Sequence, residues 1–283
     1  MILLFISILC SVTVGILFKK TKPSLNESFL MITVNYFIAA LLSTLLFEVD
    51  FSNKDLNYAL IIPLCILMPL VFYFFNKSVN LSGIIKTDIS QRISLIIPIS
   101  AAFLIFGENI STLKWIGILL GFLAVFLMLY KNDNSNNTNS YFLLLVFLGY
   151  GIIDVFFKQI AYQKNVSYTS YLFLIFCGSF IVSSLIYFFQ TKGKIKLKTK
   201  SFFFGILLGI LNFSNIYFYL KAHKIFSEQP STVFAIMNFG VITVATIVGF
   251  FYFKEKLSKK NLIGLVLAIF AISFILIAQF NHI

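Results

Sequence analysis

Residues 103–129, FLIFGENISTLKWIGILLGFLAVFLML, are the most informative part of the chain, because their pattern returns once, at residues 250–276, as FFYFKEKLSKKNLIGLVLAIFAISFIL. The two copies lie 147 positions apart and align without a gap, with nine of 27 positions identical. In each copy an apolar run ends at a carboxylate, Glu108 or Glu255, and a short polar segment leads into a second apolar run. This pattern predicts a hairpin of two membrane helices. We therefore expect one structural unit that is present twice.

The composition excludes a water-soluble protein and favours an all-α membrane protein. Apolar residues make up 59% of the chain and charged residues only 11%, and the mean hydropathy is +0.96. Continuous apolar runs of roughly 20 residues suit helices that cross about 30 Å of hydrocarbon, whereas the strands of a barrel would alternate in polarity. Ten such runs predict ten transmembrane helices, at about residues 2–18, 29–47, 56–75, 84–106, 112–130, 141–161, 168–189, 201–220, 229–253 and 261–278.

The polar segment KNDNSNNTNS, residues 131–140, is the expected linker between two halves, residues 1–130 and 141–283. A weaker self-match between residues 9–20 and 148–159 shows that both halves also begin alike. Five spans per half is an odd number, so the second half must enter the membrane upside down relative to the first. The sequence thus predicts two inverted five-helix repeats, an arrangement common among secondary transporters.

The net charge of +12 comes mostly from lysines in the loops between spans, which fits contact with anionic lipid head groups better than nucleic acid. Fourteen loop lysines lie on one side of the predicted topology and six on the other. The positive-inside rule then places the loop around Lys196 in the cytoplasm and both termini outside. The three cysteines, Cys10, Cys65 and Cys177, fall inside apolar runs without metal-ligand spacing. We expect neither a metal nor a cofactor.

The fourth run contains charged residues where a spanning helix should be apolar. Lys86, Asp88, Gln91 and Arg92 precede its apolar part, and Arg92 is the only arginine in the chain. A charge at the centre of a spanning helix costs about 2.5–3.5 kcal/mol on insertion scales, so it should face an interior cavity and have a partner. Asp88 and Arg92 are four residues apart on one helical face. Either they neutralise each other, or the helix starts at the interface, or they form a polar site.

The second copy of the repeat favours the polar site, because it has no charges at these positions. Val233, Ala235, Asn238 and Phe239 stand where the first copy has Lys86, Asp88, Gln91 and Arg92. The fold therefore does not need the charges. A single arginine offers a planar fork for a carboxylate or a phosphate.

Other polar residues inside the spans are weaker candidates. Asp154 and Lys158 form a second pair four residues apart; for Asp154 cavity function and structural pairing stay equally open, whereas Lys158 can simply mark a helix end. Glu108 and Glu255 recur at span ends, where a structural role in a turn, a cap or a pair is expected. The remaining candidates for the substrate path are three uncharged side chains: Tyr73, Asn215 and Asn238.

Ten spans in two five-helix halves, with Pro98, Gly107-Glu108, Gly117 and Gly121 in order, resemble the EamA-type transporters of the drug/metabolite transporter superfamily. The second copy departs from the pattern, with Lys254 where Gly107 stands. The resemblance implies a non-enzymatic carrier in the bacterial inner membrane that exports or exchanges amino acids, metabolites or drugs. It also implies cytoplasmic termini, against the lysine count. Coupling to a proton or another ion, and a monomeric or homodimeric state, stay open.

An intramembrane enzyme and a channel are the two alternative classes of function. An intramembrane enzyme that processes lipids would need a carboxylate cluster or a catalytic histidine at membrane depth, whereas His223 and His282 stand at the end of a span and at the end of the chain. A channel would favour a ring of charges over one asymmetric cluster. The sequence therefore favours a secondary transporter that works by alternating access, with no catalytic residues.

Overall fold

The computed structural model describes the chain apart from residues 22–23, 48–55, 83, 109–110, 130–139, 164–165, 194–197, 253–258 and 281–283. At residues 18–20, 25, 79–80, 82, 84–86, 88–89, 128–129, 140, 261 and 279–280 it describes the backbone alone. The described regular structure is entirely helical: α1 (Ile2–Thr21), α2 (Leu25–Leu46), α3 (Tyr58–Ser82), α4 (Ile84–Ile93), α5 (Ile96–Leu104), α6 (Thr112–Leu129), α7 (Ser140–Tyr162), α8 (Tyr168–Gln190), α9 (Thr199–Ile225), α10 (Pro230–Phe251) and α11 (Lys259–Phe280).

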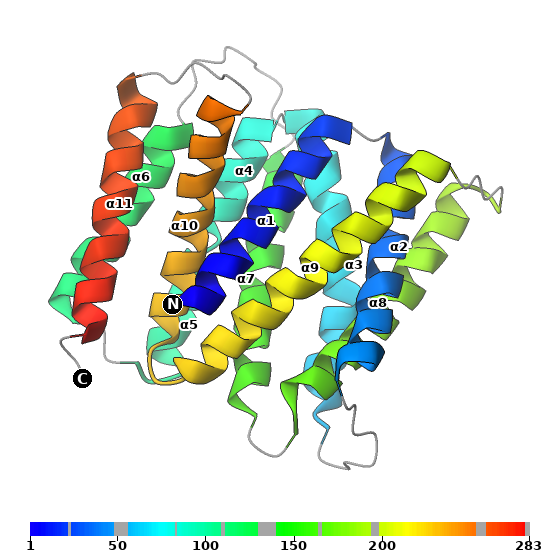
Figure 1. The fold of residues 1–283 in the computed structure, drawn as a ribbon, viewed down its shortest axis with the longest axis horizontal. Helices are drawn as coiled ribbons and strands as arrows, with labels where there is room; N and C mark the ends of the chain where they lie inside the picture. Colours follow the sequence, from blue (N-terminus) through cyan, green and yellow to red (C-terminus); the bar gives the residue numbers. More distant parts are fainter. Residues whose placement is uncertain are drawn as a thin grey trace.

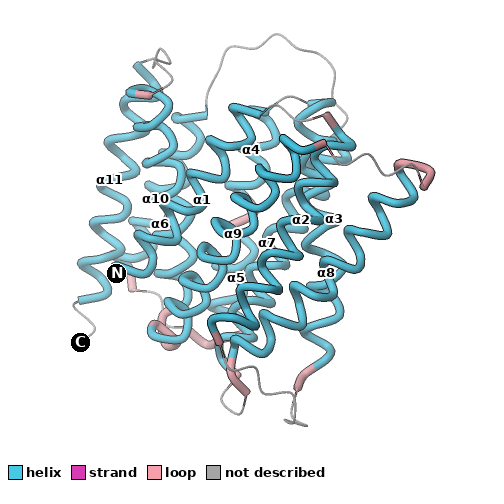
Figure 2. Tube along the Cα trace, turned by 45° about the vertical axis from the view of Figure 1, so that its right-hand side comes forward, coloured by secondary structure: helices cyan, strands magenta, loops and turns pink. Residues whose placement is uncertain are grey.

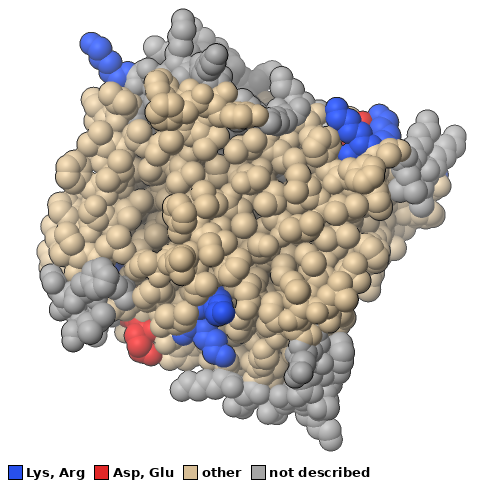
Figure 3. Space-filling view, viewed as in Figure 1, with Lys and Arg blue, Asp and Glu red and all other residues tan. Residues whose placement is uncertain are grey.

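These helices match the ten predicted spans, with α4 and α5 together forming the fourth. Within the described residues, six helices are long and apolar enough to cross a membrane. Shorter apolar helical stretches fall at the first, fourth, fifth and tenth predicted spans. One face of the molecule is uncharged across its middle, and its charged side chains lie toward the two ends (Figure 3). The prediction of an all-α membrane protein is confirmed.

The fourth span is broken after Ile93, and Pro98 explains the break. Proline has no N–H to donate to the carbonyl of the residue four positions earlier, which here is Ser94. That carbonyl instead accepts the N–H of Ile97 at 3.0 Å, a tighter turn than an α-helix makes. The span therefore continues as two short helices, α4 and α5. In contrast, α3 runs without interruption through Pro63 and Pro69.

The packing of the helices is symmetric under exchange of the two halves. Helix α3 of the first half packs against α7 and α8 of the second, and the equivalent α9 of the second half packs against α1 and α2 of the first. The contact of α1 with α10 likewise corresponds to those of α7 with α4 and α5. The equivalent helices α6 and α11 pack against each other, as do α2 and α8 (Figures 1 and 2). This two-fold relation agrees with the predicted inverted repeat.

Glycines allow the halves to approach closely at the seam between α6 and the second half. A Cβ atom on Gly117 would lie 2.8 Å from the side chain of Ile275 and 3.0 Å from the carbonyl oxygen of Ala271. On Gly121 it would lie 2.0 Å from the ring of Phe239. Small residues at such positions let membrane helices pack backbone to side chain. The Gly-x-x-x-Gly spacing in the repeat thus serves contact between its two copies.

Candidate functional site

A buried polar network lies at the end of the bundle at which α1, α6 and α10 begin, the lower end in Figure 1. We call this end the terminal side. Gly107 follows α5 with φ +65°, a conformation that glycine adopts at little cost. The N–H of Glu108 turns back to the carbonyl of Ala102 at 3.0 Å. This turn brings the carboxylate of Glu108 to the start of α10.

Glu108 caps a helix that belongs to the other half of the chain. Its Oε2 accepts the backbone N–H of Ser231 at 2.8 Å, and its Oε1 accepts the hydroxyl of Ser231. Ser231 lies in the first turn of α10, whose N-cap residue Gln229 makes no side-chain cap of its own. The first N–H groups of a helix lack partners within the helix and favour a negative charge. The carboxylate of Glu108 satisfies both needs.

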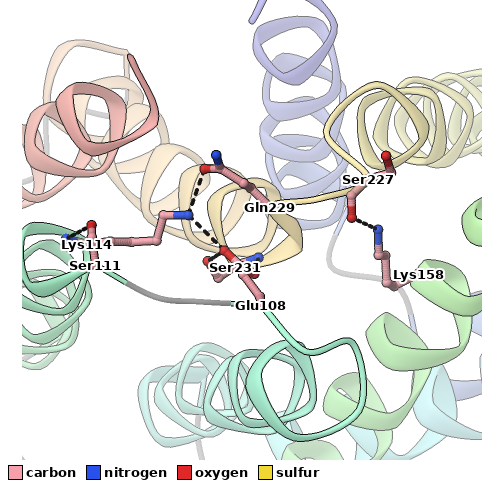
Figure 4. A network of polar contacts seen from close by, with 7 residues as sticks. All are labelled: Glu108, Ser111, Lys114, Lys158, Ser227, Gln229 and Ser231. Atoms are coloured by element: carbon pink, nitrogen blue, oxygen red, sulfur yellow. Dashed lines mark hydrogen bonds and ion pairs between the residues drawn. The ribbon is translucent and has the colours of Figure 1, made fainter. Parts of the chain in front are cut away.

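Lys114, in the first turn of α6, neutralises this carboxylate. Its Nζ donates to Glu108 Oε1 at 2.8 Å and to the side-chain oxygen of Gln229 at 2.9 Å (Figure 4). The side chains of Glu108 and Lys114 are each only 2% exposed. The ion pair is therefore shielded from water, and each charge depends on the other.

Lys158, on α7, contacts the corner at which α9 ends and α10 begins. Its Nζ donates to the carbonyl of Ser227, just beyond the last residue of α9, at 2.8 Å (Figure 4). The same Nζ lies 5.7 Å and 5.1 Å from the ring centroids of Phe106 and Tyr162. Its side chain is fully buried. A cation at a helix C-terminus is favourable for the same reason that an anion is at an N-terminus. The connection between α9 and α10 is thus fixed by opposite charges at its two ends.

We call these contacts the α9–α10 clamp, which consists of Glu108, Lys114, Lys158, Ser227, Gln229 and Ser231. The expected role of Glu108 in a turn, a cap or a pair is confirmed. The expectation that Lys158 either pairs with Asp154 or marks a helix end did not indicate its partner, Ser227, in the connection between α9 and α10.

Asp154 lies one turn before Lys158 on α7 and also turns to α9. It accepts the hydroxyl of Tyr219 at 3.0 Å. The ring of Tyr219 lies 4.6 Å from that of His223, and the His223 ring lies 4.6 Å from that of Phe234. His223 is fully buried and, in the part of the chain that the structure describes, neither ring nitrogen has a hydrogen-bond partner. The histidine placed at a span end by sequence is therefore inside the bundle.

The other predicted site residues lie on several helices. Arg92 and Gln91 are half-buried in the last turn of α4, before the break in the fourth span. The side chains of Lys86 and Asp88 lie outside the described residues, as do Lys196 and Glu255. The predicted pairing of Asp88 with Arg92 thus stays a prediction.

Of the uncharged candidates, Asn215 is the one that joins the two halves. Its amide donates to the carbonyl of Ser7 on α1 at 2.8 Å, and the hydroxyl of Ser7 donates to the Asn215 carbonyl at 2.9 Å. Asn238 donates to the carbonyl of Phe234 in its own helix at 3.0 Å. The ring of Tyr73 is tilted against that of Phe29, with centroids 5.4 Å apart. The structure therefore does not gather all the predicted residues in one contact network.

Replacing Gly107 by alanine tests the turn that positions Glu108. We expect Gly107→Ala to lower the free energy of unfolding by about 1–2 kcal/mol, because a Cβ atom is unfavourable at positive φ. The side chain itself would meet nothing within 4 Å, so crowding is not the cause. Thermal unfolding of the purified protein in detergent measures the effect. The matched control is Gly15→Ala, which also has open space but lies inside α1. An equal or larger loss in the control would contradict the role of the turn.

Comparisons with known proteins agree with this architecture. The model of the EamA-like transporter family matches residues 1–130 and 139–277. An uncharacterized protein of Haemophilus influenzae is 37% identical over 283 residues, covering 95% of each chain. The S-adenosylmethionine uptake transporter of Rickettsia prowazekii is 24% identical over 193 residues, which cover 68% of this chain and 63% of that protein.

A solved structure described as "Crystal structure of protein" superposes with a TM-score of 0.75 over 98% of this chain and 96% of that chain, at 13% identity, and so shares the fold. The family model covers both halves, and the helices fold as a bundle of two related units. The chain is a membrane transporter that belongs to the EamA-like transporter family of the drug/metabolite transporter superfamily.

Proposed function

We propose that this chain is a secondary transporter that moves a small solute across the bacterial inner membrane by alternating access, as an exporter or an exchanger. The observation that carries the proposal is the charge buried on spanning helices at the contact between the halves. Such residues are costly in a membrane and mark substrate or ion paths. Asp154, half-buried on α7, is the clearest described case, because it accepts its hydrogen bond from the neutral hydroxyl of Tyr219.

We place the centre of the substrate site at Arg92 and Asp88, with Lys86, Gln91 and Asp154 close enough to contribute. Discontinuous helices commonly form transporter binding sites, and Arg92 lies in the last turn of α4, before the break between α4 and α5. Both short helices pack against α7, which carries Asp154. Ser90 donates to the carbonyl of Leu143 at 2.5 Å, so α4 lies beside the first turns of α7. The uncharged candidates Asn215, Asn238 and Tyr73 would line the path around this centre.

The chemistry of these residues favours a substrate with both an anionic and a cationic group. The guanidinium of Arg92 suits a carboxylate or a phosphate, and the carboxylate of Asp154 suits an ammonium. S-Adenosylmethionine, which the Rickettsia prowazekii relative is described as taking up, carries an α-amino group and a carboxylate. It is therefore the first compound to test, together with free amino acids.

Movement between the halves supplies the alternating access in this proposal. The units 1–130 and 141–283 would rock against each other about the central site, with residues 131–140 as their connection. Inverted repeats of this kind provide two pseudo-symmetric states that open to opposite sides. Membrane lipids are the expected surroundings, and coupling to a proton is one way to drive the cycle.

Reconstitution in proteoliposomes tests the function. We expect saturable uptake of a labelled substrate, accelerated by unlabelled substrate on the opposite side. Protein-free liposomes provide the background. Flux that does not saturate and shows no counterflow would indicate a channel, and chemical conversion of the solute would indicate an enzyme. Either result would contradict the proposal.

A further inference from the structure

We propose that the α9–α10 clamp is the gate that closes the transport path on the terminal side, and that Glu108 must leave Ser231 when the path opens there. This inference rests on the proposed alternating access. Its first support is that the clamp joins the two halves. Glu108 and Lys114 belong to the first half, whereas Gln229 and Ser231 belong to the second. A movement that separates the halves at this end must break these bonds.

The clamp also lies at the right depth to close the path. Along α7, Gly151 faces Ile97 in α5, and Lys158 faces Phe106 beyond the end of α5. Asp154 lies between these levels and is therefore further inside the bundle than the corner between α9 and α10. Glu108 follows Phe106 at the terminal side. A solute bound near Asp154 would have to pass this corner to leave on that side.

Burial makes the clamp a closed gate in this structure. Ser231 and the following Thr232 are fully buried, and Glu108 and Lys114 are nearly so. Charge-assisted hydrogen bonds shielded from water are stronger than neutral or exposed ones. When the corner opens, water can replace the lost partners of both charges. The clamp therefore stabilises the closed arrangement without making the opening irreversible.

The repeat does not keep two of the clamp residues in its second copy. Alignment at an offset of 147 places Asn261 where Lys114 stands and Ile84 where Ser231 stands, although the carboxylate recurs as Glu255. The second copy thus has neither the lysine nor the serine of the clamp at the aligned positions, although Lys259 and Lys260 directly precede Asn261. If different contacts close the path at the two ends of the bundle, the protein can favour one of its two closed conformations in the absence of substrate.

An ion pair at the opposite end offers a matched control. Lys198 donates to Glu27 at 2.7 Å, and this pair also joins the two halves, but its side chains are 62% and 25% exposed. Removing this pair eliminates one positive and one negative charge, as in the clamp, at a place where water already competes for their hydrogen bonds. It should not alter access to the terminal side.

The test measures how fast a buried thiol near the clamp is modified. Thr232→Cys is a suitable reporter, because Thr232 is fully buried and its hydroxyl has no hydrogen-bond partner among the described residues. The native Cys10, Cys65 and Cys177 are half-buried and would be replaced by alanine. A membrane-impermeant maleimide is added to the protein in lipid nanodiscs, where both sides are accessible and no substrate is needed.

We expect Glu108→Gln with Lys114→Met to speed modification of the reporter at least about tenfold, the change in an opening equilibrium that loss of one charge-assisted hydrogen bond produces. Gln229→Leu, which removes one neutral acceptor, should speed it about threefold and serves if the double variant does not fold. Glu27→Gln with Lys198→Met should leave the rate within about twofold of the parent, as expected for an exposed pair.

Rates within twofold of the parent in both clamp variants would overturn the gate, as would an equal increase in the control. Counterflow in proteoliposomes separates this result from the proposed function. Counterflow with unchanged reporter rates would contradict the gate alone. Faster modification without any counterflow would contradict the transport function. The clamp would then close this end of the bundle without gating transport.

Discussion

Replacing Glu108 by alanine is expected to lower the free energy of unfolding by about 3–5 kcal/mol, because it leaves the ammonium of Lys114 buried without its carboxylate. Glu108 and Lys114 are each 2% exposed, so water cannot take the place of the lost partner without opening the corner. The change also leaves the N–H of Ser231 without its acceptor at the start of α10. Unfolding of the purified protein in detergent, followed by circular dichroism, measures the loss.

Two controls separate the effect of a buried charge without a partner from the effect of losing the hydrogen bond that caps α10. Glu108→Gln combined with Lys114→Met removes both charges and keeps an acceptor for Ser231, so its stability should stay within about 1.5 kcal/mol of the parent. Glu27→Ala breaks the exposed pair with Lys198 and the hydrogen bond from the N–H of Ser24 at the start of α2, and should cost about 2 kcal/mol or less. If Glu108→Ala costs no more than Glu27→Ala, the clamp does not hold α9 and α10 together.

These results would show whether the clamp stabilises the fold as a whole or favours the closed over the open folded conformation. A buried ion pair often contributes little net stability relative to a neutral pair of similar size, because desolvation offsets the attraction. The double variant can therefore be as stable as the parent and still open more readily. The clamp would then select the closed state among folded states, which is the property that a gate requires.

Much of the fold could be predicted from the sequence, because a membrane restricts what an apolar run can become. Every backbone polar group in hydrocarbon needs a partner within its own segment, so continuous apolar runs become helices of nearly fixed length. Self-similarity at 147 residues then indicated two copies. These features depend on local sequence or on its repetition.

The clamp could not be predicted in the same way, because its partners are distant in the sequence and are brought together by tertiary packing, both within the second half and between the halves. Lys158 meets Ser227, 69 residues away, and Glu108 meets Ser231, 123 residues away. The spacing of Asp154 and Lys158 favoured a local pair. In the structure each of them bonds to the α9 side instead, Asp154 to a tyrosine and Lys158 to a carbonyl. One feature of the sequence pointed to the clamp: the repeat keeps Glu108 as Glu255 but has Asn261 in place of Lys114, which indicates a role for this lysine in the first copy alone.

Arg92→Lys is expected to reduce transport by at least about tenfold although it keeps the positive charge. Lysine lacks the planar fork that binds a carboxylate or a phosphate through two parallel hydrogen bonds, and each charge-assisted bond contributes about 1.5–3 kcal/mol. Arg92 is half-buried in the last turn of α4, before the break in the span. Initial rates of counterflow at several substrate concentrations give kcat/KM for the variant. Lys198→Arg, on an exposed lysine at the opposite end, is the matched control and should transport as the parent does.

A second variant distinguishes substrate binding from mere neutralisation of charge within the helix. If Asp88 and Arg92 only neutralise each other, replacing both by leucine should leave transport intact and could stabilise the bundle, because a buried pair contributes little net stability. If Arg92 binds the substrate, the double variant should fold and fail to transport. Asp88→Asn alone should weaken both folding and transport, because it leaves a cation without its carboxylate. Parent rates in Arg92→Lys and in the double variant would place the substrate elsewhere, with Asp154 as the remaining charged candidate on α7.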